Sequence, residues 1–247
     1  MLVRRIELNA DGPARPAWEV SPESSPRGGA AVFHGYGSCK ENMLGLALAL
    51  AEAGLVCTVP DLPGHGEHPG PFGPSLLEEV RSTIEHVRRH GAALAVGHSM
   101  GGRLALLSGA DAVVAISPAL PMQPSPEGMY ALRTFSTPKV RQARPGQVVE
   151  VLGDLPIRPA FAVPVLVVLG DGDIPGIGRA AEELVSSLDG ADLVTVTEGM
   201  VLEAEEPPPG FGSYLKHWMN HSAMPSTRAV ATEVVTWAGR VLPVSRR

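Results

Sequence analysis

Cysteine is scarce in this sequence. Among 247 residues there are two cysteines, Cys39 in an expected loop and Cys57 in an apolar run. Neither has a second thiol nearby at the spacing of a metal site or a redox pair, so we interpret both as reduced thiols. Cys57 is expected to pack in the core, because a free cysteine behaves as a small buried hydrophobe.

Long apolar runs and basic tracts are missing as well. No apolar run reaches the ~18 residues of a membrane span. The opening MLVRRIELNADG has two arginines but lacks the following apolar stretch of a secretory signal. We therefore expect a cytoplasmic protein without a membrane partner. The net charge is -6 with both signs interspersed, which argues against a nucleic-acid partner.

The chain has the composition of a soluble globular protein, with 44% hydrophobic and 19% charged residues. Its length suits a single α/β domain over residues 1–247. Short apolar runs alternate with longer helix-like segments, which predicts an α/β fold with a mostly parallel central sheet and helices on both faces. The first two runs, LVRRIEL and AWEV, are expected to form an antiparallel pair.

The remaining predicted elements follow that alternation. Strands are expected over residues 29–35, 55–61, 93–99, 112–118, 163–171 and 191–197. Helices are expected over residues 42–54, 75–91, 100–109, 176–190 and 226–242. Asn42 and Ser75 are suitable N-cap residues for the first two helices.

Two stretches interrupt the alternation. Residues 118–164 are rich in proline and too long for an ordinary connection, which predicts a small lid or cap insertion. Residues 198–226 contain three consecutive prolines, which exclude helix and central strand locally. An aromatic and histidine-bearing piece follows the prolines, and we expect it to form a second excursion above the sheet.

Three glycines surround one serine in the stretch VGHSMGG. Gly97, Ser99 and Gly101 form a G-x-S-x-G motif between a predicted strand and a predicted helix. This context is typical of a nucleophile elbow, in which the serine occupies a strained turn and side chains at the glycine positions would strike the neighbouring strand and helix. The alternative is an ordinary strand-to-helix turn, with Ser99 only as the N-cap.

Four motifs follow one another along the chain, namely HGYG, DLPGHGEH, GHSMGG and VPVLVVLGDGD. In this order they resemble the α/β-hydrolase fold superfamily, in its esterase- and lipase-like serine branch, and the likeness extends from Gly28 to Leu242. The resemblance implies an α/β-hydrolase fold and acyl transfer by a serine nucleophile, which needs a base and oxyanion donors.

The resemblance implies a catalytic role for several residues. Ser99 is the expected nucleophile, and the backbone N–H groups of Tyr36 and Met100 are the expected oxyanion hole. The acid that orients the base is expected to be Asp173, with Asp171 as the alternative. The base is expected to be His221, because the next residues lead directly into the last helix, with His217 as the alternative.

Other histidines invite a metal interpretation. His65 and His68 lie near Asp61 and Glu67 in DLPGHGEH. The same run resembles the family's structural loop, which we favour, so we expect no metal and no cofactor. His98, beside the nucleophile, is given no role in proton transfer.

The expected reaction is hydrolysis of a small-molecule carboxylic ester or thioester through an acyl-enzyme. The fold does not choose the substrate, so C–C bond hydrolysis or perhydrolysis by the same triad, and a non-catalytic binding protein, stay open. The lid stretch offers apolar side chains for the pocket, namely Leu120, Met122, Met129, Tyr130, Leu132 and Phe135. Substrate contacts are assigned to Tyr36, Met122, Met129 and Tyr130.

The same stretch carries four cationic residues, which leave open a carboxylate- or phosphate-bearing substrate, including a carrier-linked thioester, although such charges usually form a solvated face. They are Arg133, Lys139, Arg141 and Arg144.

Overall fold

A computed structural model describes the chain except for residues 9–13, 121–123, 161, 198–211 and 243–247. Its centre is a sheet of eight strands in the order β1-β2-β4-β3-β5-β6-β7-β8. The strands are β1 (Leu2–Leu8), β2 (Arg15–Ser21), β3 (Gly28–Phe33), β4 (Leu55–Pro60), β5 (Ala93–His98), β6 (Ala112–Ile116), β7 (Val165–Gly170) and β8 (Ala191–Val196).

The sheet is parallel from β3 to β8, and β1 and β2 extend it as antiparallel strands beside β4. Every residue of β3, β4, β5, β6 and β7 is buried. These strands read as continuous apolar runs because helices cover both of their faces. The predicted parallel sheet and its antiparallel opening pair are confirmed.

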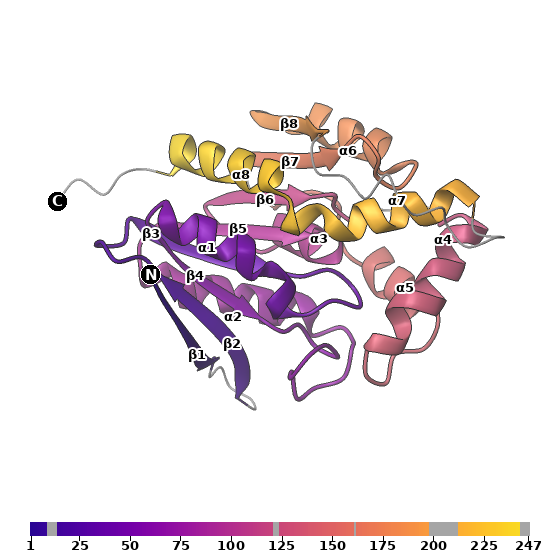
Figure 1. Ribbon diagram of the computed structural model, residues 1–247, viewed down its shortest axis with the longest axis horizontal. Helices are drawn as coiled ribbons and strands as arrows, with labels where there is room; N and C mark the ends of the chain where they lie inside the picture. Colours follow the sequence, from indigo (N-terminus) through magenta and orange to yellow (C-terminus); the bar gives the residue numbers. More distant parts are fainter. Residues whose placement is uncertain (9–13, 121–123, 161, 198–211, 243–247) are drawn as a thin grey trace.

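The helices are α1 (Leu44–Glu52), α2 (Leu76–Arg88), α3 (Met100–Leu106), α4 (Pro126–Ala131), α5 (Gln147–Gly153), α6 (Ile177–Ser186), α7 (Gly212–Ala223) and α8 (Arg228–Val241). Leu50 of α1 and Trp237 of α8 pack on one face of the sheet with Val32 and Val96. Ile84 of α2, Leu104 of α3 and Leu184 of α6 belong to the core on the other face. Helices α4, α5 and α7 gather at one end of the sheet (Figure 1).

The helix starts differ in detail from the prediction. The N-cap of α1 is Met43, because Lys40–Met43 forms a 3₁₀ turn that includes Asn42. Ser75 occupies the N-cap of α2, but its side chain makes no capping hydrogen bond.

Residues 118–164, the predicted insertion, fold mainly into short helical pieces. Besides α4 and α5 they contain a π turn over Leu132–Ser136 and a 3₁₀ turn over Thr137–Lys139. We call the described residues 124–160 the helical segment. Helix α7 was not predicted, since the prolines that precede its histidines suggested irregular chain.

Candidate active site

Ser99 sits at a sharp bend between β5 and α3. Its backbone has φ 53° and ψ -114°, a strained conformation for a residue with a side chain. The neighbouring chain holds it there: Ser99 N donates to Ile116 O at 2.9 Å, and Ala119 N donates to Ser99 O at 2.9 Å. The bend is therefore built into the sheet.

The glycines around Ser99 are required by contact. A Cβ on Gly97 would lie 2.1 Å from Gly101 O, and one on Gly101 would lie 2.4 Å from Phe33 O. These distances are far below van der Waals contact with backbone that cannot move aside. The steric explanation predicted for the glycines is confirmed.

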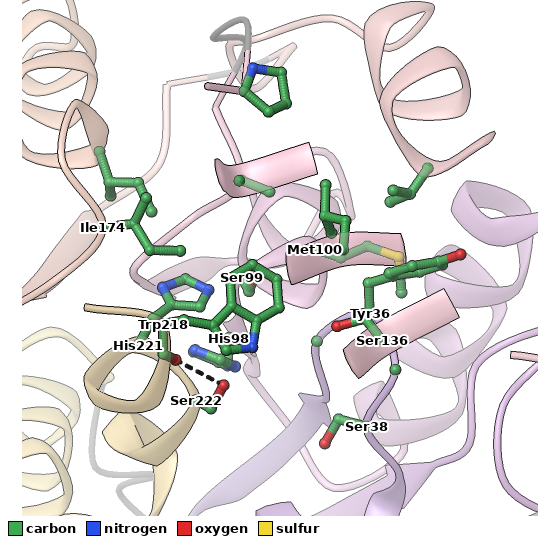
Figure 2. Close-up of a pocket in the computed structure, with 18 of the residues that line it drawn as sticks. Tyr36, Ser38, His98, Ser99, Met100, Ser136, Ile174, Trp218, His221 and Ser222 are labelled. Atoms are coloured by element: carbon green, nitrogen blue, oxygen red, sulfur yellow. Dashed lines mark hydrogen bonds between the residues drawn. The ribbon is translucent and has the colours of Figure 1, made fainter. Parts of the chain in front are cut away.

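The Ser99 side chain makes no hydrogen bond to another described residue. Although Ser99 occupies the N-cap position of α3, its side chain makes no capping hydrogen bond, so capping does not explain the serine. Ser99 lines a pocket of about 910 Å³ that is also lined by Tyr36, Met100 and His221 (Figure 2).

His221 and Asp173 meet beside this pocket. His221 is carried by α7, and Asp173 follows β7. Nδ1 of His221 lies 2.8 Å from Oδ1 of Asp173, and both residues are buried. An ionised carboxylate only accepts, so the proton of a neutral imidazole lies on Nδ1 and Nε2 keeps its lone pair. Asp171, the alternative acid, is exposed.

His217, the alternative base, lies one helical turn before His221 on α7. Its Nδ1 lies 3.0 Å from Gly172 O, which also accepts a hydrogen bond from Asn220 Nδ2. His217 does not line the pocket. The geometry places His221 on the wall of the pocket that Ser99 lines and Asp173 behind His221, whereas neither His217 nor Asp171 lines the pocket.

The surroundings of Asp173 favour its charged form. Burial of the carboxyl group raises its pKa, but the hydrogen bond and charge of His221 oppose this, with further donors from Ser117 and Ile174 N, and the net pKa is lowered. Asp173 is therefore an anion that can stabilise a cationic imidazole.

His98 packs against the imidazole of His221, with ring centroids 4.7 Å apart. Burial, with the charge of His221 adding to it, lowers the pKa of His98 to about 3. His98 is therefore neutral near pH 7, which agrees with an absence of proton transfer through it.

Tyr36 and Met100 both line the pocket. Met100 begins α3, so the helix supplies no acceptor for its N–H. Two hydrogen bonds hold the loop that carries Tyr36. Gly37 N donates to His65 Nε2 at 3.0 Å, and Leu62 N donates to His34 Nε2 at 3.0 Å. Their role as oxyanion donors stays a prediction.

The DLPGHGEH run, which includes Leu62 and His65, is itself held by side-chain contacts. Asp61 accepts hydrogen bonds from Lys40 N at 2.9 Å, Lys40 Nζ at 2.6 Å and Glu67 N at 2.8 Å, and His68 Nε2 lies 2.7 Å from Glu79 Oε2. These contacts fit the structural interpretation of the run. Within the described ranges, no three His, Cys, Asp or Glu residues are grouped to hold a metal ion.

The pocket wall is largely apolar where the helical segment and α6 meet it. Leu120, Leu132 and Phe135 line it as the sequence predicted, with further apolar residues Val148, Leu152, Ile174 and Ile177. Met129 and Tyr130, predicted to contact substrate, do not line it. Gly128 of α4 lines the pocket, and Met129 and Tyr130 lie on other sides of that helix. Tyr130 lines a separate hollow of about 380 Å³. Met122 lies outside the described residues.

Three of the four cationic residues of the predicted lid do not line the pocket. Arg144 forms an ion pair with Glu150, and neither Arg133 nor Arg141 lines the pocket. Lys139 does line it. Apart from the imidazoles, it is the one described cationic side chain on that wall.

Sequence reasoning missed three residues of this site. Tyr214 and Trp218 of α7 line the pocket. They are four residues apart and lie on the same side of the helix as His221. This helical spacing is a sequence signal, but the preceding prolines obscured it. Ser117, which contacts Asp173, directly follows β6. Its only sequence signal is a polar residue at the carboxyl end of a buried strand.

Comparison with known proteins identifies relatives of this architecture. The sequence model of the "Alpha/beta hydrolase family" matches residues 31–237. The structure resembles Est1E from Butyrivibrio proteoclasticus with bound ferulic acid, at 19% identity and TM-score 0.63, covering 78% of this chain and 89% of that one. No match was found among curated proteins.

Two other solved structures cover nearly the whole chain. Dienelactone hydrolase from Anabaena variabilis is 17% identical with TM-score 0.64, covering 98% of this chain and 99% of that one. The thioesterase domain from the curacin biosynthetic pathway is 15% identical with TM-score 0.64, covering 95% and 100%. At these identities the likeness shows the fold. In the part of the chain that is described, no helix is long and apolar enough to cross a bilayer.

The buried His98 predicts an acid-sensitive fold. Its pKa is about 3 in the folded protein against 6.5 for the ordinary group, so the unfolded chain binds more protons and stability falls as the pH drops from about 6.5 toward 3. In His98→Gln, the slope of the unfolding free energy against pH in this window should be smaller by up to ~1.4 kcal/mol per pH unit. Urea unfolding of both proteins at several pH values measures it, and parallel curves would show that His98 is not held neutral.

Proposed function

Because this chain belongs to the alpha/beta hydrolase family, we propose that it is a serine hydrolase that cleaves a carboxylic ester or thioester through an acyl-enzyme. One observation carries the proposal. Ser99 lines the same pocket as His221, and the contact of His221 Nδ1 with Asp173 at 2.8 Å leaves Nε2 available as a base.

In the proposed cycle, His221 Nε2 takes the proton of the Ser99 hydroxyl as Oγ attacks the substrate carbonyl. The N–H groups of Tyr36 and Met100 donate to the oxyanion that forms. The imidazolium then gives its proton to the departing alcohol or thiol, which leaves an ester on Ser99. Water, activated by the same imidazole, attacks this ester, and the proton returns to Ser99 as the acid leaves.

Ser99 Oγ makes no hydrogen bond to a described residue, so a hydrogen bond from Ser99 to His221 Nε2 has to form when substrate binds. This is common in free enzymes, where catalytic hydrogen bonds are often long until the substrate complex forms. The strained bend favours the contact, because it projects Ser99 from the sheet into the pocket.

The pocket favours an uncharged, apolar acyl group. Its wall includes Leu132, Phe135, Leu152 and Ile177, and Lys139 is exposed. Burying a charge among such side chains without a partner is costly. We take the helical segment to be the lid of this pocket and the chain to be one domain. The dienelactone hydrolase and the thioesterase domain among the structural neighbours support the reaction class.

The nucleophile and base can be tested together with a fluorophosphonate probe and p-nitrophenyl esters. We expect labelling and ester cleavage by the wild type, and a loss of ~10⁴-fold or more in kcat for Ser99→Ala and His221→Ala. His217→Ala is the matched control, because His217 lies on the same helix outside the pocket, and its kcat/KM should stay within about threefold.

Two results would contradict the proposal. Folded wild-type protein that neither reacts with the probe nor cleaves any ester or thioester would exclude the serine hydrolase. Loss of labelling in His217→Ala together with full labelling in His221→Ala would reverse the assignment of the base.

The apolar pocket predicts a preference among acyl chains that Leu152 controls. In Leu152→Trp the indole should fill part of the pocket and lower the ratio of kcat/KM for octanoate over acetate esters by ~10-fold or more. Ile157→Trp is the control, since Ile157 lies in the same segment, is 44% exposed and does not line the pocket. An equal ratio in all three proteins would place the acyl group elsewhere.

A further inference from the structure

Ser117 has an unusual backbone for its position. It directly follows β6, is fully buried and has φ 44°. Ser99, Ser117 and Gln142 are the non-glycine residues with positive φ among those described. The next residue is Pro118, and a proline restricts the residue before it to extended conformations. Such strain persists only where the surrounding structure enforces it, and it concentrates at functional sites.

The contacts of Ser117 explain what enforces it. Its backbone N–H donates to Val168 O of β7 at 2.8 Å, and its hydroxyl donates to Oδ2 of Asp173. Strands β6 and β7 pair with Ile116 opposite Val168. A residue just past the end of β6 therefore reaches the loop just past β7, where Asp173 lies.

The two oxygens of Asp173 have different donors. Oδ1 accepts from His221 Nδ1 at 2.8 Å and from Ile174 N at 2.6 Å. Oδ2 accepts from Ser117, and no other described residue donates to it. Since Asp173 is only 8% exposed, water has little access to replace this donor. Without the hydroxyl, a buried anionic oxygen would lack a partner, and the carboxylate would be less restrained from turning about its Cβ–Cγ bond.

We propose that Ser117 is a positioning residue, whose hydroxyl holds the Asp173 carboxylate in the orientation that binds and orients His221. The inference rests on the proposed function, because it assigns Ser117 a place behind the acid of the same site. It also gives a reason for the left-handed backbone, which directs a side chain from the end of β6 toward Asp173.

Two substitutions test the role in the full chain. Ser117→Ala removes the hydroxyl and keeps Cβ, whereas Ser117→Gly removes it and also suits the positive φ. We expect both variants to lose ~10- to 100-fold in kcat/KM for a p-nitrophenyl ester. Gln142→Gly is the matched control, because it relieves a similar backbone at an exposed residue, and it should keep wild-type kcat/KM.

A double-mutant cycle separates positioning from general stability. In an Asp173→Ala background, Ser117→Ala should cost less than about twofold, because the group that it orients is gone. A loss as large as in the wild type would show that Ser117 acts through something other than Asp173.

A spectroscopic readout keeps the test independent of turnover. The proton between His221 Nδ1 and Asp173 should give a low-field ¹H NMR resonance in the wild type that is absent in Asp173→Ala. We expect it to shift or broaden in both Ser117 variants and to stay unchanged in Gln142→Gly. If the Ser117 variants keep both the resonance and wild-type kcat/KM, the positioning role is overturned while the proposed function stands. An inert wild type would instead refute the proposed function, and the resonance would still decide the role of Ser117.

Discussion

The bend at residue 99 leaves no room for side chains at the glycines on either side of it. Backbone from β3 and α3 passes within 2.1 to 2.4 Å of where those Cβ atoms would lie. A serine held there with φ 53° cannot relax into the helix or the strand. The rest of the site depends on this constraint, since it fixes Ser99 at the pocket into which α7 brings His221 and behind which β7 brings Asp173.

Short-range patterns in the sequence were enough to predict the fold and much of the candidate site. The buried strands are continuous apolar runs that alternate with helices, so a mostly parallel sheet could be predicted, whereas the order of its strands could not. The need for glycine at positions 97 and 101 could be predicted from the local motif, although a Cβ on Gly101 would strike Phe33 O of the distant strand β3. Asp173 could be preferred to Asp171 from the motif alone, and the structure finds Asp173 buried against His221 and Asp171 exposed.

The parts of the structure that could not be predicted depend on packing between residues far apart in the sequence. Helix α7 forms although prolines precede it, and it turns His221 toward the pocket while His217 contacts Gly172 O. The helices α4 and α5 have six and seven residues, too short for a clear periodicity, so the sequence could not show that Met129 and Tyr130 point away from the pocket. The role of Ser117 depends on the register of β6 against β7, which no local pattern reveals.

In the proposed mechanism, Ser99, His221 and the two backbone N–H groups converge on one reacting carbon. A crystal structure of the protein after reaction with a p-nitrophenyl phosphonate tests it most directly, because the adduct mimics the tetrahedral intermediate. We expect phosphorus to be bonded to Ser99 Oγ, with one phosphonyl oxygen ~2.7–3.1 Å from the N–H nitrogens of Tyr36 and Met100 and with His221 Nε2 hydrogen-bonded to the adduct. An adduct on another residue, or a phosphonyl oxygen that faces away from both N–H groups, would contradict it.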